Sequence, residues 1–118
     1  MPEVVLEVGP ILDVAYATPL SEELSENFDC VINKSNGFVM KNHGALFCSP
    51  VSVFEAVELL EMSESMAKSI VVAKIFGQVN TLKKQDLSNL DDVLKVRSLK
   101  IPGGDENLSL VDVYQTEK

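Results

Sequence analysis

Residues Gly37–Cys48, with the sequence GFVMKNHGALFC, decide the fold of this chain and contain its only histidine, His43. Two short apolar runs flank the turn-forming sequence Asn42-His43-Gly44, which predicts two strands joined by a tight bend. His43 is therefore expected at a strand end, where a side chain is held in place and still faces a cleft. A histidine in that position is suited to binding a metal or moving a proton. The alternative is a turn histidine that hydrogen-bonds its own loop.

The segments upstream of this hairpin alternate between strand and helix patterns. Residues 4–8 and 11–14 are β-branched and apolar, which predicts two short strands with a kink between them. Tyr16 follows in a loop, where we interpret it as packing its ring against the sheet rather than as a proton donor. Ser21 is a good N-cap for a helix that we expect to end near Asn33.

The longest predicted helix follows the hairpin. Ser49 is expected to cap it, Pro50 to occupy its first position, and Gly77 to end it. Its apolar stripe, which we expect to supply most of the core, comprises Ala56, Leu59, Leu60, Ser63, Met66, Ala67, Ile70, Val71 and Ala73. A shorter helix is predicted over residues 82–97. Residues 98–118 form a tail, in which residues 107–118 are either a strand packed on a neighbour or a frayed end.

Interleaved strands and helices place the chain in the α/β or α+β class, with helices on a small sheet that is at least partly antiparallel. A length of 118 residues with 46% hydrophobic and 24% charged residues suits one domain with one modest core.

The composition also restricts the location and the partners. No apolar run approaches the ~20 residues that span a membrane. The first residues lack the features of a signal peptide, so we expect a cytoplasmic protein. A net charge of −8 without a cluster of Lys or Arg argues against nucleic acids and anionic membranes as partners. Cys30 and Cys48 are isolated, and we expect both to be small core residues in a reducing compartment.

Several blocks of sequence resemble the class II aldolase/adducin family, which includes fuculose-phosphate-type aldolases. NHGALF at residues 42–47 is followed by EAVELLE at residues 55–61. YATPLSEEL at residues 16–24 is similar to the family's Tyr-Ala-Thr-Pro-Gly-Ser-x-Glu-Leu segment, and residues 67–77 are similar to the end of its long helix. The resemblance covers roughly Gly9 to Leu94 and only the C-terminal part of the family's domain.

The resemblance implies a metal site and a fold. In the family, the histidine of Asn-His-Gly is one of three histidine ligands to a catalytic divalent metal, usually zinc, and His43 matches that position. The other two ligands form a His-x-His pair earlier in the chain, near a glutamate that serves as ligand and base, but this sequence has no second histidine. The implied fold has three layers, with helices on both faces of a mostly antiparallel sheet. Residues 1–97 would be its C-terminal part, and residues 98–118 a tail.

Two functional hypotheses follow from the resemblance. In the first, the chain is the C-terminal part of a divalent-metal-dependent sugar-phosphate aldolase, an aldehyde-lyase, and is inactive alone. One imidazole does not hold zinc specifically, so the site assignment is limited to His43 as a metal ligand, with no catalytic or cofactor-binding residue and no tight zinc binding by this chain alone. In the second, the chain is a non-catalytic association module like the adducin head domains.

The expected partners follow from these hypotheses. The family's enzymes form tetramers, so we expect either further copies of this chain or a missing N-terminal half. A sugar phosphate would bind only when the site is complete.

Overall fold

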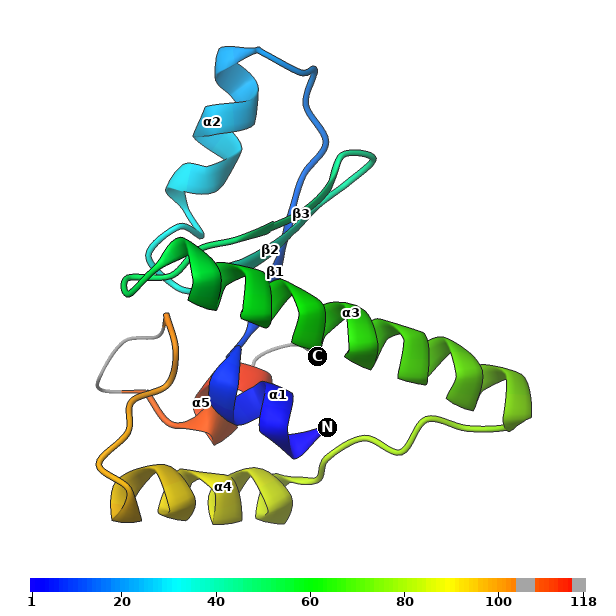
Figure 1. Cartoon of the computed structure of the whole chain (residues 1–118), viewed down its shortest axis with the longest axis vertical. Helices are drawn as coiled ribbons and strands as arrows, with labels where there is room; N and C mark the ends of the chain where they lie inside the picture. Colours follow the sequence, from blue (N-terminus) through cyan, green and yellow to red (C-terminus); the bar gives the residue numbers. More distant parts are fainter. Residues whose placement is uncertain (104–107, 116–118) are drawn as a thin grey trace.

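A computed structural model describes residues 1–103 and 108–115 of the chain (Figure 1). Helices and strands interleave, and a small three-stranded sheet lies between helices, which confirms the mixed α/β character. In chain order the elements are α1 (Pro2–Glu7), β1 (Ile11–Val14), α2 (Glu22–Asp29), β2 (Gly37–Met40), β3 (Gly44–Phe47), α3 (Val53–Phe76), α4 (Lys84–Val96) and α5 (Leu110–Gln115).

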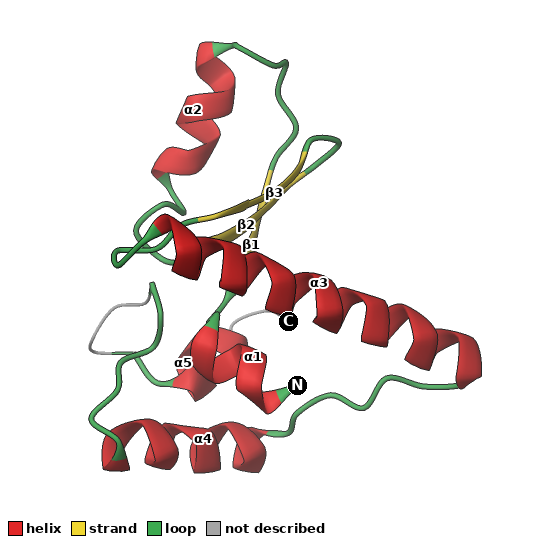
Figure 2. Cartoon of the chain, viewed as in Figure 1, coloured by secondary structure: helices red, strands yellow, loops and turns green. Residues whose placement is uncertain are grey.

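The sheet has the strand order β1-β2-β3. The predicted hairpin is confirmed, because β2 and β3 pair antiparallel with Phe38 opposite Leu46. β1 pairs with β2 in parallel, so the sheet is mixed rather than mostly antiparallel. Figure 2 shows α2 on one side of the sheet and α3 on the other. Side chains follow the strand alternation: the ring of Phe38 contacts that of Phe28 in α2, while Phe47 packs near Leu59 of α3.

Residues 4–8 were expected to form a strand, and this prediction is wrong, because Pro2–Glu7 is the helix α1. Proline suits the first turn of a helix, and Pro2 occupies that turn here. The Val8 N–H donates to the carbonyl of Val4 at 2.9 Å, and both side chains are almost fully buried. Residues four apart share one helix face, so packing of that face outweighs the strand preference of valine.

The helix α3 begins three residues later than expected. Ser52 is its N-cap and accepts a hydrogen bond from the Glu55 N–H, whereas Ser49 accepts from the Val51 N–H in the preceding turn. The C-cap is Gly77, as predicted. The predicted cap of α2 is confirmed, since Ser21 accepts from the N–H of Leu24 at the start of that helix. Cys30 and Cys48 are both exposed, which contradicts their expected place in the core.

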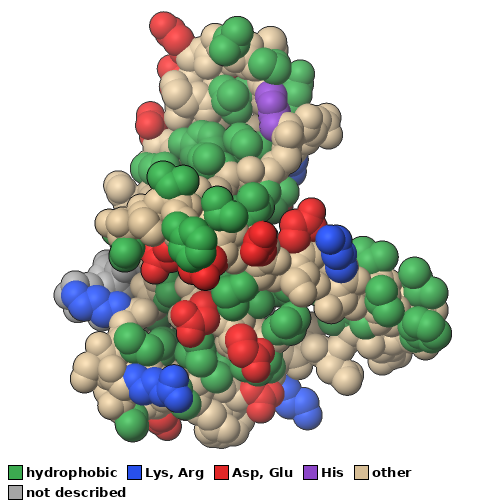
Figure 3. Space-filling view, in the orientation of Figure 1, with side chains coloured by type: hydrophobic (Ala, Val, Ile, Leu, Met, Phe, Trp, Pro, Cys, Tyr) green, Lys and Arg blue, Asp and Glu red, His purple; other side chains and the backbone are tan. Residues whose placement is uncertain are grey.

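The core divides into two hydrophobic clusters. One joins α1 to α3 and the sheet through Val4, Val8 and Leu59. The other joins α4 to the C-terminal segment through Leu87, Leu94, Ile101 and Leu110. Among the expected stripe positions of α3, only Leu59 and Ser63 are buried, so the prediction that this stripe supplies most of the core is wrong. Figure 3 shows hydrophobic side chains gathered instead on the surface at the far end of α3.

The C-terminal segment forms a helix, α5, rather than the strand or frayed end that we expected. Ser109 and Asp112 cap it reciprocally: the Ser109 N–H donates to the Asp112 carboxylate, and the Asp112 N–H donates to the Ser109 hydroxyl. The hydrogen bond from the Ser109 hydroxyl lowers the pKa of Asp112 below its ordinary value. The parts of this prediction that fall on residues 104–107 and 116–118 lie outside the described residues. Nowhere in residues 1–103 or 108–115 is a helix both long and apolar enough to cross a membrane.

Candidate functional site

The turn between β2 and β3 fixes the backbone of His43. The His43 N–H donates to the carbonyl of Met40 at 3.1 Å, which closes the turn. Asn42 has a φ of 61°, a left-handed conformation that asparagine tolerates better than most residues. The Lys41 N–H donates to the carbonyl of Val14 at 3.1 Å and ties the turn to β1. The hairpin tip is therefore held by backbone hydrogen bonds to both neighbouring strands.

Two contacts orient the imidazole of His43. Its Nε2 lies 2.8 Å from the carbonyl oxygen of Ala17, which precedes it by 26 residues. Because a carbonyl only accepts hydrogen bonds, Nε2 carries the proton and Nδ1 keeps a free lone pair. The ring of Tyr16 stacks on the imidazole with centroids 5.6 Å apart and an interplanar angle of 24°. His43 therefore bonds to the loop after β1, not to its own loop, and Tyr16 packs on His43 rather than on the sheet.

The loop between β1 and α2 is itself braced, so the Ala17 carbonyl has a defined position. Ala17 is buried, and α2 ties down the residues on both sides of it. The Asn27 amide donates to the carbonyl of Ala15, and the hydroxyl of Ser21 donates to the carbonyl of Thr18. The sequence predicted that Ser21 caps α2. It did not predict that the same residue also helps to position the Ala17 carbonyl, which accepts the hydrogen bond from His43.

The described residues place only one strong metal ligand at this turn. No group of three or more His, Cys, Asp or Glu side chains in residues 1–103 and 108–115 is arranged to hold a metal. A catalytic zinc takes three protein ligands and keeps one open position. Cys48 lies five residues after His43, across the length of β3, or about 16 Å at the rise of a strand. The ligand set implied by the resemblance is therefore not supplied by this part of the chain.

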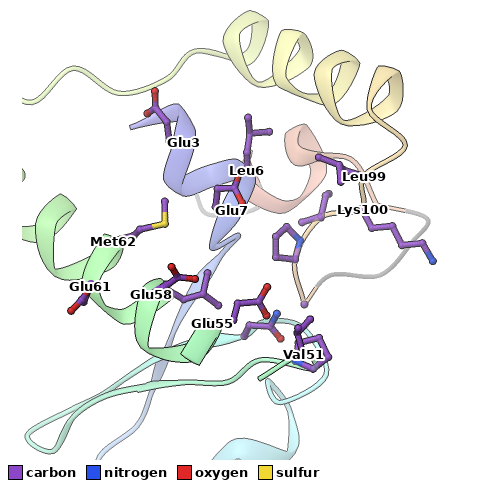
Figure 4. A pocket seen from close by; sticks show the side chains of 16 residues that line it. Glu3, Leu6, Glu7, Val51, Glu55, Glu58, Glu61, Met62, Leu99 and Lys100 are labelled. Carbon is purple, nitrogen blue, oxygen red and sulfur yellow. The ribbon is translucent and has the colours of Figure 1, made fainter. Parts of the chain in front are cut away.

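A separate cleft of about 970 Å³ lies between α1, the first half of α3 and residues 99–103 (Figure 4). Five glutamates line it, together with Lys100 and apolar side chains such as Leu59 and Met62. The glutamates are Glu3, Glu7, Glu55, Glu58 and Glu61. The spacing of the α3 glutamates along the helix by itself indicates only a solvated face. The α3 glutamates share this cleft with Glu3 and Glu7 because residues 2–7 form the helix α1.

Comparison of the chain with protein-family models, curated proteins and solved structures returns no match. His43, the one site residue assigned from the sequence, lies at the hairpin turn where it was expected. What the chain does must therefore be inferred from that turn and from its surroundings.

Proposed function

We propose that this chain is the C-terminal part of a class II aldolase-like protein in which His43 is one ligand of a divalent metal. The observation that carries this proposal is the hydrogen bond from His43 Nε2 to the Ala17 carbonyl. Metal-binding histidines almost always donate their second ring N–H to a carbonyl, carboxylate or water, which fixes the tautomer and the ring orientation. The motif Asn42-His43-Gly44 and the second contact from Tyr16 support the same assignment.

The rest of the metal site would come from polypeptide outside this sequence. One histidine is present, and three protein ligands are needed, so the metal does not fit this chain alone and no catalytic step is assigned to it. When complete, such a site would use the metal as a Lewis acid on the oxygens of a sugar-phosphate substrate.

The tautomer of His43 is the first test. Because the chain has one histidine, its ring ¹⁵N signals are unambiguous in NMR spectra. We expect the Nε2–H tautomer without metal and a selective shift of the Nδ1 signal on addition of Zn²⁺. An Nδ1–H tautomer, or no response of the ring to Zn²⁺, would remove His43 as a ligand. Lys41→Ala, at an exposed position of the same turn, is the matched control and should leave the ring signals unchanged.

Metal content and activity test the incompleteness of the site. We expect protein dialysed without chelator to retain no stoichiometric zinc, since His43 lacks partner ligands. We also expect no retro-aldol cleavage of fuculose- or rhamnulose-phosphate-type substrates by this chain alone. A bound zinc that depends on His43, or a metal-dependent rate that His43→Ala abolishes, would show that this chain holds a complete site.

A non-catalytic association module, like the adducin head domains, is the second candidate. The exposed apolar residues of α3, including Val71 and Ile75, favour it, because a surface of that kind marks an interaction site. The genomic sequence upstream of the Met1 codon distinguishes the two candidates. A reading frame that encodes a His-x-His pair there would support the aldolase, and an unrelated sequence would support the module.

A further inference from the structure

The outward face of α3 is an apolar surface that the rest of the described chain leaves exposed. The C-terminal end of the helix extends past the body of the molecule (Figure 1). The exposed fractions are 58% for Val71, 51% for Val72 and 76% for Ile75. Helices that are apolar on all sides are normally buried, so these residues indicate a surface that something covers.

Six exposed residues of this face are arranged symmetrically about the middle of α3. Val57, Leu60 and Glu64 lie in the first half of the outward face, and Lys68, Val72 and Ile75 lie in the second half. The steps between them are 3, 4, 4, 4 and 3 residues, which keeps all six on one helix face. These six residues are symmetric about position 66, so among them each apolar residue has an apolar counterpart at the same distance from the centre, and Glu64 has Lys68.

We propose that a second copy of this chain covers this face, with the two α3 helices antiparallel about a two-fold axis that passes between Glu64 and Lys68. Val57 of each copy then faces Ile75 of the other, and Leu60 faces Val72. Glu64 of each copy faces Lys68 of the other, which places two opposite-charge contacts at the centre. A self-complementary surface of this kind is what a two-fold homodimer requires. The proposal does not depend on the aldolase relationship.

Charge fixes the antiparallel orientation. Residues 55–64 of α3 carry four glutamates and no Lys or Arg, whereas residues 65–79 carry Lys68 and Lys74 and no acidic residue. An antiparallel pair sets the acidic half of each helix along the basic half of the other, and a parallel pair sets like charge against like. The chain as a whole carries a net charge of −8, so two copies repel each other except where acidic residues of one meet basic residues of the other, as they do along an antiparallel pair of α3 helices.

The chain as a whole exposes more surface than a compact monomer. The accessible surface of the chain is 8458 Å², against about 6,300 Å² for a compact monomer of this mass. The radius of gyration of 15.0 Å likewise exceeds the roughly 13.5 Å of a compact chain of this length. The excess of roughly 2,100 Å² is spread over the whole chain, and the ~800 Å² that each partner buries in a standard interface is less than half of it.

Charge reversal with mixing tests the proposal. Sedimentation or light scattering of the wild-type chain at micromolar concentration should give a dimer. Glu64→Lys alone, or Lys68→Glu alone, brings like charges together at both central contacts and should raise the dissociation constant about tenfold. An equimolar mixture of the two variants restores opposite charges at both contacts and should dimerise as the wild type does. Lys34→Glu, at an exposed position outside α3, is the control and should not change the constant.

An apolar variant gives a second measurement. Ile75→Lys should also weaken the dimer, whereas Val96→Lys, at an equally exposed position in the last turn of α4, should leave it intact. Circular dichroism confirms that each variant is folded. A folded wild-type monomer overturns the proposal, and so does an assembly that the reversals leave unchanged or that mixing fails to restore. If the folded wild-type chain is a monomer, other polypeptide covers α3. If the assembly is unchanged by the reversals or not restored by mixing, another face holds the copies together.

Discussion

The helices α3 and α4 both carry many apolar residues, yet the chain covers only one of them. α4 buries Leu87 and Leu94 against α5 and the segment before it, and its opposite face is polar apart from Val96. α3 has 24 residues and buries only Leu59 and Ser63. The difference shows that an apolar stripe predicts burial within the same chain only when the rest of the helix is polar. A helix that is apolar on several sides needs more partners than one small sheet provides.

The largest effect is expected from a substitution that leaves a cavity in the hydrophobic cluster around α4. Leu110 has no exposed surface and packs on Leu87 and Leu94. Leu110→Ala should lower the free energy of unfolding by about 3 kcal/mol, since it removes buried methyl groups and leaves a cavity. Urea unfolding measures the change. Val96→Ala, at a position in α4 that is 85% exposed, should change the stability by less than about 0.5 kcal/mol. Equal losses in the two variants would contradict the assignment of the core to this cluster.

A smaller effect is expected from the polar contact that seats α5 on α4. The buried carboxylate of Asp91 accepts a hydrogen bond from the Leu110 N–H at 2.8 Å. Asp91→Ala leaves that buried N–H unpaired and should cost about 1–3 kcal/mol. Asp91→Asn keeps an acceptor oxygen and should cost less. Thermal unfolding followed by circular dichroism compares both with Asn89→Ala, a change at an exposed position of the same helix. Matching losses for Asp91→Ala and Asn89→Ala would show that the contact contributes nothing.

The smallest expected effect is on the pH dependence of the stability, which tests whether α5 is buried in the cluster around α4. Burial raises the pKa of Tyr114 in α5 to about 12, from an ordinary value of 10. Below pH 10 the phenol is neutral in both states, so its contribution to stability is complete. Between pH 10 and pH 12 the unfolded chain loses the proton and the folded chain keeps it, so stability falls. Tyr114→Phe should reduce this fall in urea midpoints, whereas Tyr16→Phe, at a half-exposed ring, should not. An unchanged fall in Tyr114→Phe would exclude a buried phenol.

The elements predicted from the sequence are those with local causes. The hairpin follows from the turn residues around Asn42, and α2 follows from its cap at Ser21. α1 was missed because a short valine-rich run fits a strand and a helix equally, and contact with Leu59 decides between them. The reciprocal cap of Ser109 and Asp112 was a readable signal of α5, since a hydroxyl residue three positions before a carboxylate marks a helix start.

The surroundings of His43 had no local cause and could not be predicted. The sequence placed His43 at the turn but gave no sign that Ala17 would accept its hydrogen bond or that Tyr16 would stack on it. Both contacts arise only because β1 pairs in parallel with β2 and carries the following loop past the hairpin tip. The residue of the candidate site could therefore be predicted from the sequence, whereas the geometry of the site could not.

The parallel pairing of β1 with β2 also has a consequence for the order of folding. The hairpin closes over three residues, whereas β1 reaches β2 only after the chain has passed through α2, and closing a longer loop costs more entropy. We expect the hairpin to be formed in the folding transition state and β1 to join afterwards. Truncating Leu46 should then slow folding, and truncating Val14 should mainly speed unfolding. Stopped-flow kinetics of the two variants measure this order, and the reverse pattern would place the docking of β1 first. His43 would in that case meet its acceptor early, before its own turn is complete.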